Sequence, residues 1–211
     1  TMIINYSPES FPFKVMFEDL LKCRLEDITI DESEIHWDAE KTPGGGLDPL
    51  YAKIYPFKFK TLYRDFLKHI GVEIAQRAPS VRIVPTNTSY TYGPTTDGVN
   101  THRDGDPPYY HPPWETNYWM PLTNTDKHNC LYVEGTPYIL RPGQVLVFDG
   151  NTQRHGTPVF NKSHTRVSMD FRCVKKKDYD PSLLTDVKIK SRGEWFPQNE
   201  YFTTEEYYTC V

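Results

Sequence analysis

The sequence lacks the features that mark membrane, secreted or nucleic-acid-binding proteins. No run approaches the roughly 18 consecutive apolar residues of a membrane-spanning helix, and residues 1–13 show no basic stretch followed by an apolar one, so we expect no signal peptide. The 4 cysteines are scattered without a CxxC pair, which favours a reduced, cytoplasmic compartment. The net charge is −4 and the main basic cluster is Lys175–Lys177, so nucleic acid and membrane surfaces are not expected partners.

What the sequence does contain points to a small β-rich domain. A length of 211 residues suits one domain, and 37% hydrophobic with 25% charged residues is typical of a globular chain. The chain has 15 Tyr, 18 Pro and 12 Gly. Aromatic residues favour strands, and Pro and Gly favour turns, so this composition predicts many short strands and argues against a helical bundle.

The chain divides into three parts within one expected domain, 1–211. Residues 1–80 are expected to form a helical cover, with helical spacing of apolar residues from Phe13 to about Cys23 and again from Lys60 to about Gly71. Residues 81–174 are expected to form the β core. Its candidate strands are 81–84, 88–92, 115–122, 129–133, 138–140, 145–148 and 165–174. Short strands without intervening helices predict a mainly β (α+β) jelly-roll, with the helices on the outer face of one sheet.

The remaining part, 175–211, is an extension whose aromatic residues cluster in 193–211. Such a density of aromatic side chains predicts that the segment packs on something. The sequence leaves two alternatives open: the chain's own barrel, or a second copy in a homodimer.

Two His-x-Asp patterns are candidates for metal ligands, because side chains at i and i+2 on a strand point the same way. With 7 His and 28 Asp+Glu in the chain, about one such match is expected by chance. His36-Trp37-Asp38 lies in the loop-rich first part and is interpreted as a surface or interhelical site. His102-Arg103-Asp104 lies in the strand-rich part, and we take it as the metal-binding pair.

Further along the chain, the sequence supplies the rest of a site for iron and an acidic co-substrate. His155 follows a predicted strand and turn, and Arg166-Val167-Ser168 follows on the last long strand. Two histidines and one carboxylate on one face of a metal leave three adjacent positions open, as in non-haem Fe(II) oxygenases. Arg166 offers a bidentate fork to a carboxylate, and Ser168 lies on the same side of the strand to offer a hydroxyl.

The last strand alternates in a way that suits this interpretation. Arg166, Ser168 and Asp170 face one way, while Val167, Met169, Phe171 and Cys173 face the other. The pattern predicts a polar, ligand-holding interior and an apolar outer face covered by the N-terminal helices. The alternative is a half-buried strand whose polar face meets water.

At these residues the sequence resembles the Fe(II)/2-oxoglutarate-dependent dioxygenases, and among them most closely the streptomycin-biosynthesis-type members. The resemblance covers about residues 81–174. It is carried by His102-Arg103-Asp104, His111, residues 115–122, residues 132–134, His155-Gly156, Asn161 and residues 165–172. The resemblance implies a double-stranded β-helix, iron ligation by His102, Asp104 and His155, and 2-oxoglutarate binding by Arg166 and Ser168. It implies Fe(II), 2-oxoglutarate and O2 as cofactor and co-substrates, with release of succinate and CO2.

Further residues near these motifs are candidates for contacts with the co-substrate or substrate. Asn117 is expected either to touch 2-oxoglutarate or to bond the backbone, with Trp119 beside it on the same face. Tyr109 and His111 lie in a proline-rich stretch after the ligands, which is either a substrate-facing loop or a rigid loop on the barrel rim. His111 is also a conceivable fourth ligand. Related halogenases replace the carboxylate with a small residue, so the presence of Asp104 favours hydroxylation.

The sequence therefore predicts a hydroxylase that acts on a small molecule. One alternative is a cupin-like metalloenzyme with non-oxidative chemistry, which has no reason to place Arg-x-Ser after the second histidine. The sequence is also compatible with a hydroxylase of a protein or peptide and, less well, with a non-catalytic β-sandwich binding module.

Overall fold

The computed structural model describes residues 1–28, 59–76, 79–84, 86, 95–96, 98–107, 111–158, 163–179, 188–191, 194–197 and 208–210. The strand predicted at 88–92, the His36-Trp37-Asp38 pattern, Tyr109 and Asn161 lie outside the described residues.

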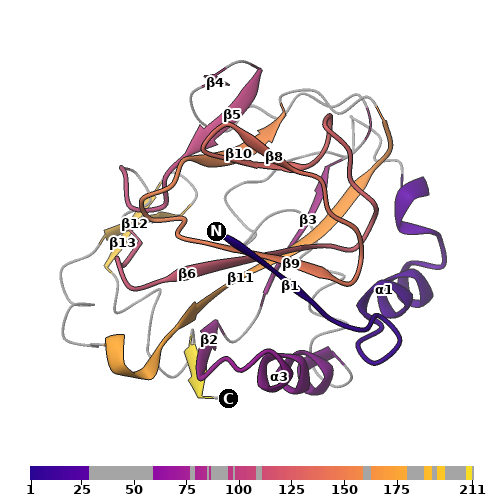
Figure 1. Ribbon diagram of the computed structural model, residues 1–211, viewed down its shortest axis with the longest axis horizontal. Coiled ribbons are helices and arrows are strands. Elements are labelled where there is room, and N and C mark those ends of the chain that lie inside the picture. Colours follow the sequence, from indigo (N-terminus) through magenta and orange to yellow (C-terminus); the bar gives the residue numbers. More distant parts are fainter. Residues whose placement is uncertain are drawn as a thin grey trace.

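Two antiparallel sheets make up the body of the protein (Figure 1). The large sheet has the order β1 (Met2–Asn5), β9 (Gln144–Phe148), β6 (Thr116–Pro121), β11 (Arg166–Val174), β2 (Ile74–Gln76) and β14 (Tyr208–Cys210), and β3 (Ser80–Val84) also pairs with β11. The small sheet has the order β4 (Thr95–Thr96), β5 (Val99–His102), β10 (His155–Pro158), β7 (Leu131–Val133) and β8 (Thr136–Tyr138). β12 (Lys188–Ser191) and β13 (Glu194–Pro197) form a separate hairpin.

The strand order confirms the predicted double-stranded β-helix. Within the large sheet, β3, β11, β6 and β9 are neighbours, and within the small sheet β5, β10, β7 and β8 are neighbours. Along the chain these eight strands pass between the two sheets, so that β5 and β10, far apart in sequence, lie side by side. This is the jelly-roll topology, and it brings the ends of β5 and β10 to one place.

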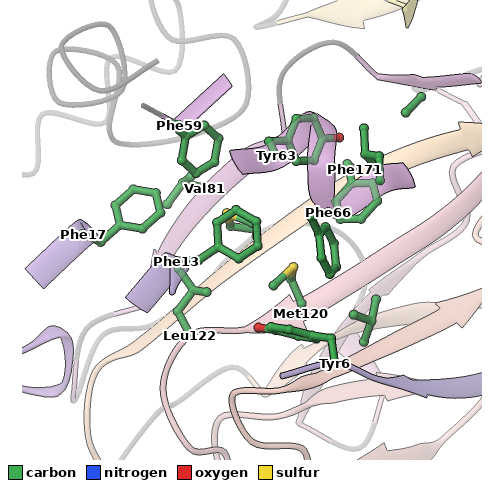
Figure 2. Packing of buried hydrophobic residues seen from close by; sticks show 14 of the residues in the cluster. Tyr6, Phe13, Phe17, Phe59, Tyr63, Phe66, Val81, Met120, Leu122 and Phe171 are labelled. Atoms are coloured by element: carbon green, nitrogen blue, oxygen red, sulfur yellow. The ribbon is translucent and has the colours of Figure 1, made fainter. Parts of the chain in front are cut away.

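The helices cover the outer face of the large sheet, as predicted. α1 (Phe13–Leu21) and α3 (Lys60–His69) lie on the side away from the small sheet (Figure 1). Figure 2 shows their aromatic residues packed against β6 and β11, with Phe66 among Phe13, Tyr6 and Phe171. Two short 3-10 turns, η1 (Leu25–Asp27) and η3 (Lys176–Asp178), complete the described helical segments. No helix in the described part of the chain is long and apolar enough to cross a membrane.

The alternation of β11 separates two cores. Val167, Met169, Phe171 and Cys173 belong to the outer core under the helices. A second core lies between the sheets and consists of Trp119, Leu131, Val133, Leu140, Leu146 and Phe148. The opposite face of β11 therefore points to the space between the sheets, and Arg166 and Ser168 on it are 1% and 0% exposed. The interpretation of β11 as a strand with its polar face in water is wrong.

The structure departs from the sequence predictions mainly at short strands. The first part of the chain supplies β1 and β2 as well as helices, because runs of three or four residues are too short to show a period and form strands by pairing with β9 and β11. The strand expected at 138–140 is β8, two residues earlier. β14 in the C-terminal extension pairs with β2, which joins that part of the extension to the chain's own sheet.

Candidate metal centre

Three side chains converge where β5 ends and β10 begins. His102 and His155 are register partners on these strands, and their rings are 4.4 Å apart between centroids. Asp104 follows two residues after His102 and is 2% exposed. One ligand atom from each residue lies within 4.8 Å of the other two. The structure therefore brings together the three residues that the sequence singled out, in an arrangement that could hold a metal ion.

The protonation of His155 leaves a nitrogen ready for a metal. Its Nδ1 donates to the carbonyl of Gln153 at 3.0 Å, so Nε2 carries the lone pair and lies 3.5 Å from Oδ1 of Asp104. Burial lowers the pKa of His155 from 6.5 to about 4, against the opposing effect of the Asp104 carboxylate. The imidazole is therefore neutral near pH 7, which is the form that binds metals.

Asp104 presents its two oxygens to different partners. Oδ1 lies 3.3 Å from Nε2 of His102 and faces the histidines. Oδ2 accepts hydrogen bonds from Nδ2 of Asn117 at 2.7 Å and from Nη2 of Arg172 at 3.0 Å. Burial raises the pKa of Asp104, but the charge of Arg172 and the neighbouring histidines outweigh it and hold the pKa well below its usual value. Asp104 is therefore anionic, and its Oδ2 is already engaged in two hydrogen bonds while its Oδ1 faces the histidines.

A second carboxylate lies behind this group. Glu115 is buried, and its Oε2 lies 3.4 Å from Nε of Arg172 and 2.9 Å from Nδ1 of His111. The guanidinium of Arg172 thus bridges the two buried carboxylates of Asp104 and Glu115. His111 is not part of the three-residue ligand group; the structure places it against Glu115 instead.

The turn after β9 contacts Asp104 and Asn117 and holds them in place. The backbone carbonyl of Gly150 accepts the N–H of Asp104 at 2.8 Å. A Cβ at Gly150 would lie 2.3 Å from Nδ2 of Asn117, so only glycine lets this amide reach Asp104. The neighbouring Asn151 donates to the carbonyls of His111 and Pro112 at 2.8 and 2.7 Å, which ties down the start of the segment from 111 to 115.

The residues predicted to hold 2-oxoglutarate lie on the inner face of β11. Arg166 donates from Nη1 to the carbonyl of Asn129 at 3.1 Å, and its guanidinium lies 5.7 Å from the centre of the Trp119 ring. Ser168 Oγ and Thr157 Oγ1 are buried hydroxyls that lack a hydrogen-bond partner among the described residues. Thr157 alternates with His155 and so shares its face of β10.

The structure shows where the sequence candidates lie and adds residues that the sequence did not predict. Asn117 holds Asp104 rather than the backbone, and Trp119 lies inside the barrel beside Arg166. Sequence reasoning missed the roles of Arg172, Glu115 and Gly150. The alternation that marked Arg166, Ser168 and Asp170 extends to Arg172, so this pattern could have found it.

Comparisons with known proteins add a relative and several distant folds. No protein-family model matches the chain. The streptomycin biosynthesis protein StrG of Streptomyces griseus is 38% identical over 147 residues, which are 69% of this chain and 68% of the relative.

Two solved structures illustrate the distant folds. AviO1 from Streptomyces viridochromogenes Tue57 has 15% identity and a TM-score of 0.45, covering 84% of this chain and 91% of that one. CytC3 with Fe(II) and alpha-ketoglutarate has 17% identity and a TM-score of 0.42, covering 88% of this chain and 78% of that one. These two likenesses are too distant to bear on the site.

The similarity to StrG is much stronger, because 38% of the matched residues are identical and the match covers more than two thirds of each chain. The chain therefore belongs to the family of the streptomycin biosynthesis protein StrG.

Proposed function

We propose that the protein is an Fe(II)- and 2-oxoglutarate-dependent oxygenase that hydroxylates a small molecule. The observation that carries the proposal is the convergence of His102, Asp104 and His155 between two sheets whose inner faces also bear a buried arginine and buried hydroxyls. Two imidazoles and one carboxylate are the ligands of non-haem Fe(II) oxygenases.

The surrounding residues fit a dicarboxylate co-substrate. A buried hydroxyl without a partner costs free energy, so Ser168 from one sheet and Thr157 from the other both favour a ligand with oxygen acceptors. Arg166 is 1% exposed and presents the planar fork that pairs with carboxylates. A non-oxidative metalloenzyme of the same fold would need neither group.

The charges support the same ligands. With their side chains charged, Asp104 and Glu115 balance Arg166 and Arg172, so the described residues of the site carry no net charge. A divalent cation bound together with a dianionic co-substrate keeps that balance. Either ligand alone would leave an uncompensated buried charge, which is costly.

The chain's own residues position the ligands and exclude water. Fe(II) and 2-oxoglutarate, when bound, would supply the oxidising chemistry, in which O2 is consumed and succinate and CO2 are released. Asp104 and the two histidines would hold the metal, Arg166 would orient the co-substrate carboxylate, and the apolar inner core that contains Trp119 would help to exclude water. Among the predicted substrate contacts, Trp119 and His111 lie in the described part of this site, and their contact with substrate remains part of the proposal.

A small-molecule substrate is supported by the relative, whose name places it in the biosynthesis of streptomycin. We expect succinate release when the protein is supplied with Fe(II), 2-oxoglutarate and the right member of a panel of amino acids, sugars, nucleosides and short peptides. Release with peptides alone would instead support a peptide hydroxylase.

The decisive variant is Asp104→Ala, which should abolish both substrate-coupled and uncoupled succinate formation. Wild-type succinate release from that variant would overturn the proposal.

A further inference from the structure

We propose that Arg172, oriented by Glu115, is a positioning residue that keeps Asp104 a one-oxygen ligand of the metal. This role rests on the proposed function, because it concerns the metal bound by Asp104. It gives a role to two residues that lie within the sequence motifs, in 115–122 and 165–172, and that have no assigned role there.

The first observation is that the two carboxylate oxygens of Asp104 have different partners. Oδ1 faces the histidines, at 3.3 Å from Nε2 of His102. Oδ2 already accepts from Arg172 at 3.0 Å and from Asn117 at 2.7 Å. A carboxylate that bound the metal through both oxygens would have to release at least part of these two bonds.

The second observation is that strand register dictates this arrangement. Arg172 on β11 and Asn117 on β6 are direct cross-strand partners, so their side chains stand next to each other on the inner face. Glu115 precedes Asn117 by two residues, and period-two alternation gives it the same face. The three residues therefore meet because of backbone pairing.

The third observation is that Arg172 is itself held in place. Its Nε lies 3.4 Å from Oε2 of Glu115, while its Nη2 points to Asp104. The side chains of Glu115 and Asp104 are 1% and 3% exposed, and that of Arg172 is 12% exposed. A planar guanidinium between two buried carboxylates has little freedom to turn, so it fixes the orientation of the Asp104 carboxylate.

The consequence concerns the open positions on the metal. Two histidines and one carboxylate oxygen leave three positions, which a bidentate 2-oxo acid and O2 together require. A second oxygen from Asp104 would take one of them. By engaging Oδ2, Arg172 keeps all three positions available.

Charge alone predicts the opposite effect of losing Arg172, which makes the role testable. A cation close to the metal repels it, so removing a purely electrostatic arginine would tighten metal binding. Removing a group that orients a metal ligand weakens metal binding instead, by about 10- to 100-fold for hydrogen-bonding partners of this kind.

The experiment compares Co(II) binding by calorimetry, and the absorption spectrum of bound Co(II), in the wild type and in Arg172→Gln, Arg172→Lys and Glu115→Gln. The matched control is Arg82→Gln, which removes another inner-face ion pair of β11, that of Arg82 with Asp170 at 2.5 Å. Thermal unfolding of each variant shows whether it is folded.

We expect Arg172→Gln to raise the Kd for Co(II) about 10- to 100-fold and to alter the spectrum toward a higher coordination number. Arg172→Lys keeps the charge but loses the fork, so it should show the same spectral change with a smaller loss of affinity. Glu115→Gln should raise the Kd severalfold. Arg82→Gln should stay within about twofold of the wild type, since the Arg82–Asp170 pair is partly open to water, with side chains 36% and 18% exposed, and such pairs contribute little.

An unchanged or tighter Kd with an unchanged spectrum in folded Arg172→Gln would overturn the role. If that variant does not fold, the same result in Arg172→Lys would overturn it equally. A folded wild type that binds no Co(II) would overturn the proposed function together with this role, whereas wild-type binding with an unaffected Arg172 variant would overturn the role alone.

Discussion

Arg172 and Asn117 lie directly opposite each other on neighbouring strands, and both donate to the same oxygen of Asp104. The pairing of β11 with β6 thereby holds the carboxylate of Asp104, which itself lies just beyond the end of β5, a strand of the other sheet. The site depends on the correct register of both sheets, so changes far from the metal in sequence should alter metal binding.

Gly150 should be intolerant of a side chain because of Asn117. Gly150→Ala places a Cβ 2.3 Å from Nδ2 of Asn117, so we expect a loss of about 1–3 kcal/mol in unfolding free energy and weaker metal binding. Asn117→Ala removes the obstructed group. The double variant should therefore be no less stable than Asn117→Ala alone, as measured by denaturant unfolding. Additive losses in the double variant would contradict the contact.

The inner face of β11 should control the affinity for 2-oxoglutarate. Ser168→Ala should raise the KM for 2-oxoglutarate about 10-fold, and Arg166→Gln about 100-fold, with the Kd for the metal unchanged. Thr101→Val is the matched control, because it removes a buried hydroxyl that lacks a described partner but alternates with His102 and faces away. Steady-state succinate kinetics measure these values. A KM for Ser168→Ala equal to that of the control would remove Ser168 from the co-substrate site.

The metal-free protein should lose stability between about pH 6.5 and pH 4. The pKa of His155 is about 4 in the folded protein and 6.5 when unfolded, so the unfolded chain takes up more protons in this interval. Keeping His155 neutral does not lower the unfolding free energy above pH 6.5, whereas by pH 4 it has lowered that free energy by about 3 kcal/mol. Urea unfolding at several pH values should show that the unfolding free energy of His155→Gln changes less with pH than that of the wild type. Equal changes with pH in the two proteins would show that His155 is not buried in neutral form.

The helical cover should be essential to the fold. Phe66 is fully buried, and its ring contacts those of Tyr6, Phe11, Phe13 and Phe171. Phe66→Ala should cost about 3–5 kcal/mol in guanidinium unfolding. Val15→Ala on the exposed side of α1 should cost less than about 0.5 kcal/mol. Comparable losses at the two positions would mean that the helices do not pack as the structure shows.

The sequence predicts part of the candidate site because its signal is local. Arg166 and Ser168 share one face of one strand, so period-two alternation groups them. His102 and Asp104 are only two residues apart, although Asp104 lies just beyond the end of β5, whereas His155 joins them through the pairing of β5 with β10. The helices from Phe13 and Lys60 follow from apolar spacing in the same way, and both are confirmed.

The contacts around His102, Asp104 and His155 depend on how distant strands pair. That pairing cannot be predicted from the pattern of a single sequence. Arg172 reaches Asp104 across 68 positions of chain, and position 150 needs glycine because the side chain of Asn117 passes over it. β1 and β2 are likewise stabilised by neighbours rather than by their own three or four residues.

In the proposed mechanism, one metal and one 2-oxo acid share the site built on His102, Asp104 and His155. An anaerobic titration of the Fe(II)-loaded protein with 2-oxoglutarate, followed by absorption, tests this central claim most directly. We predict that a new absorption band develops to saturation at one equivalent in the wild type, weakens in Arg166→Gln and is absent in His155→Ala. A wild-type protein that binds Fe(II) but shows no spectral response to 2-oxoglutarate would contradict the claim and favour a non-oxidative metalloenzyme of the same fold.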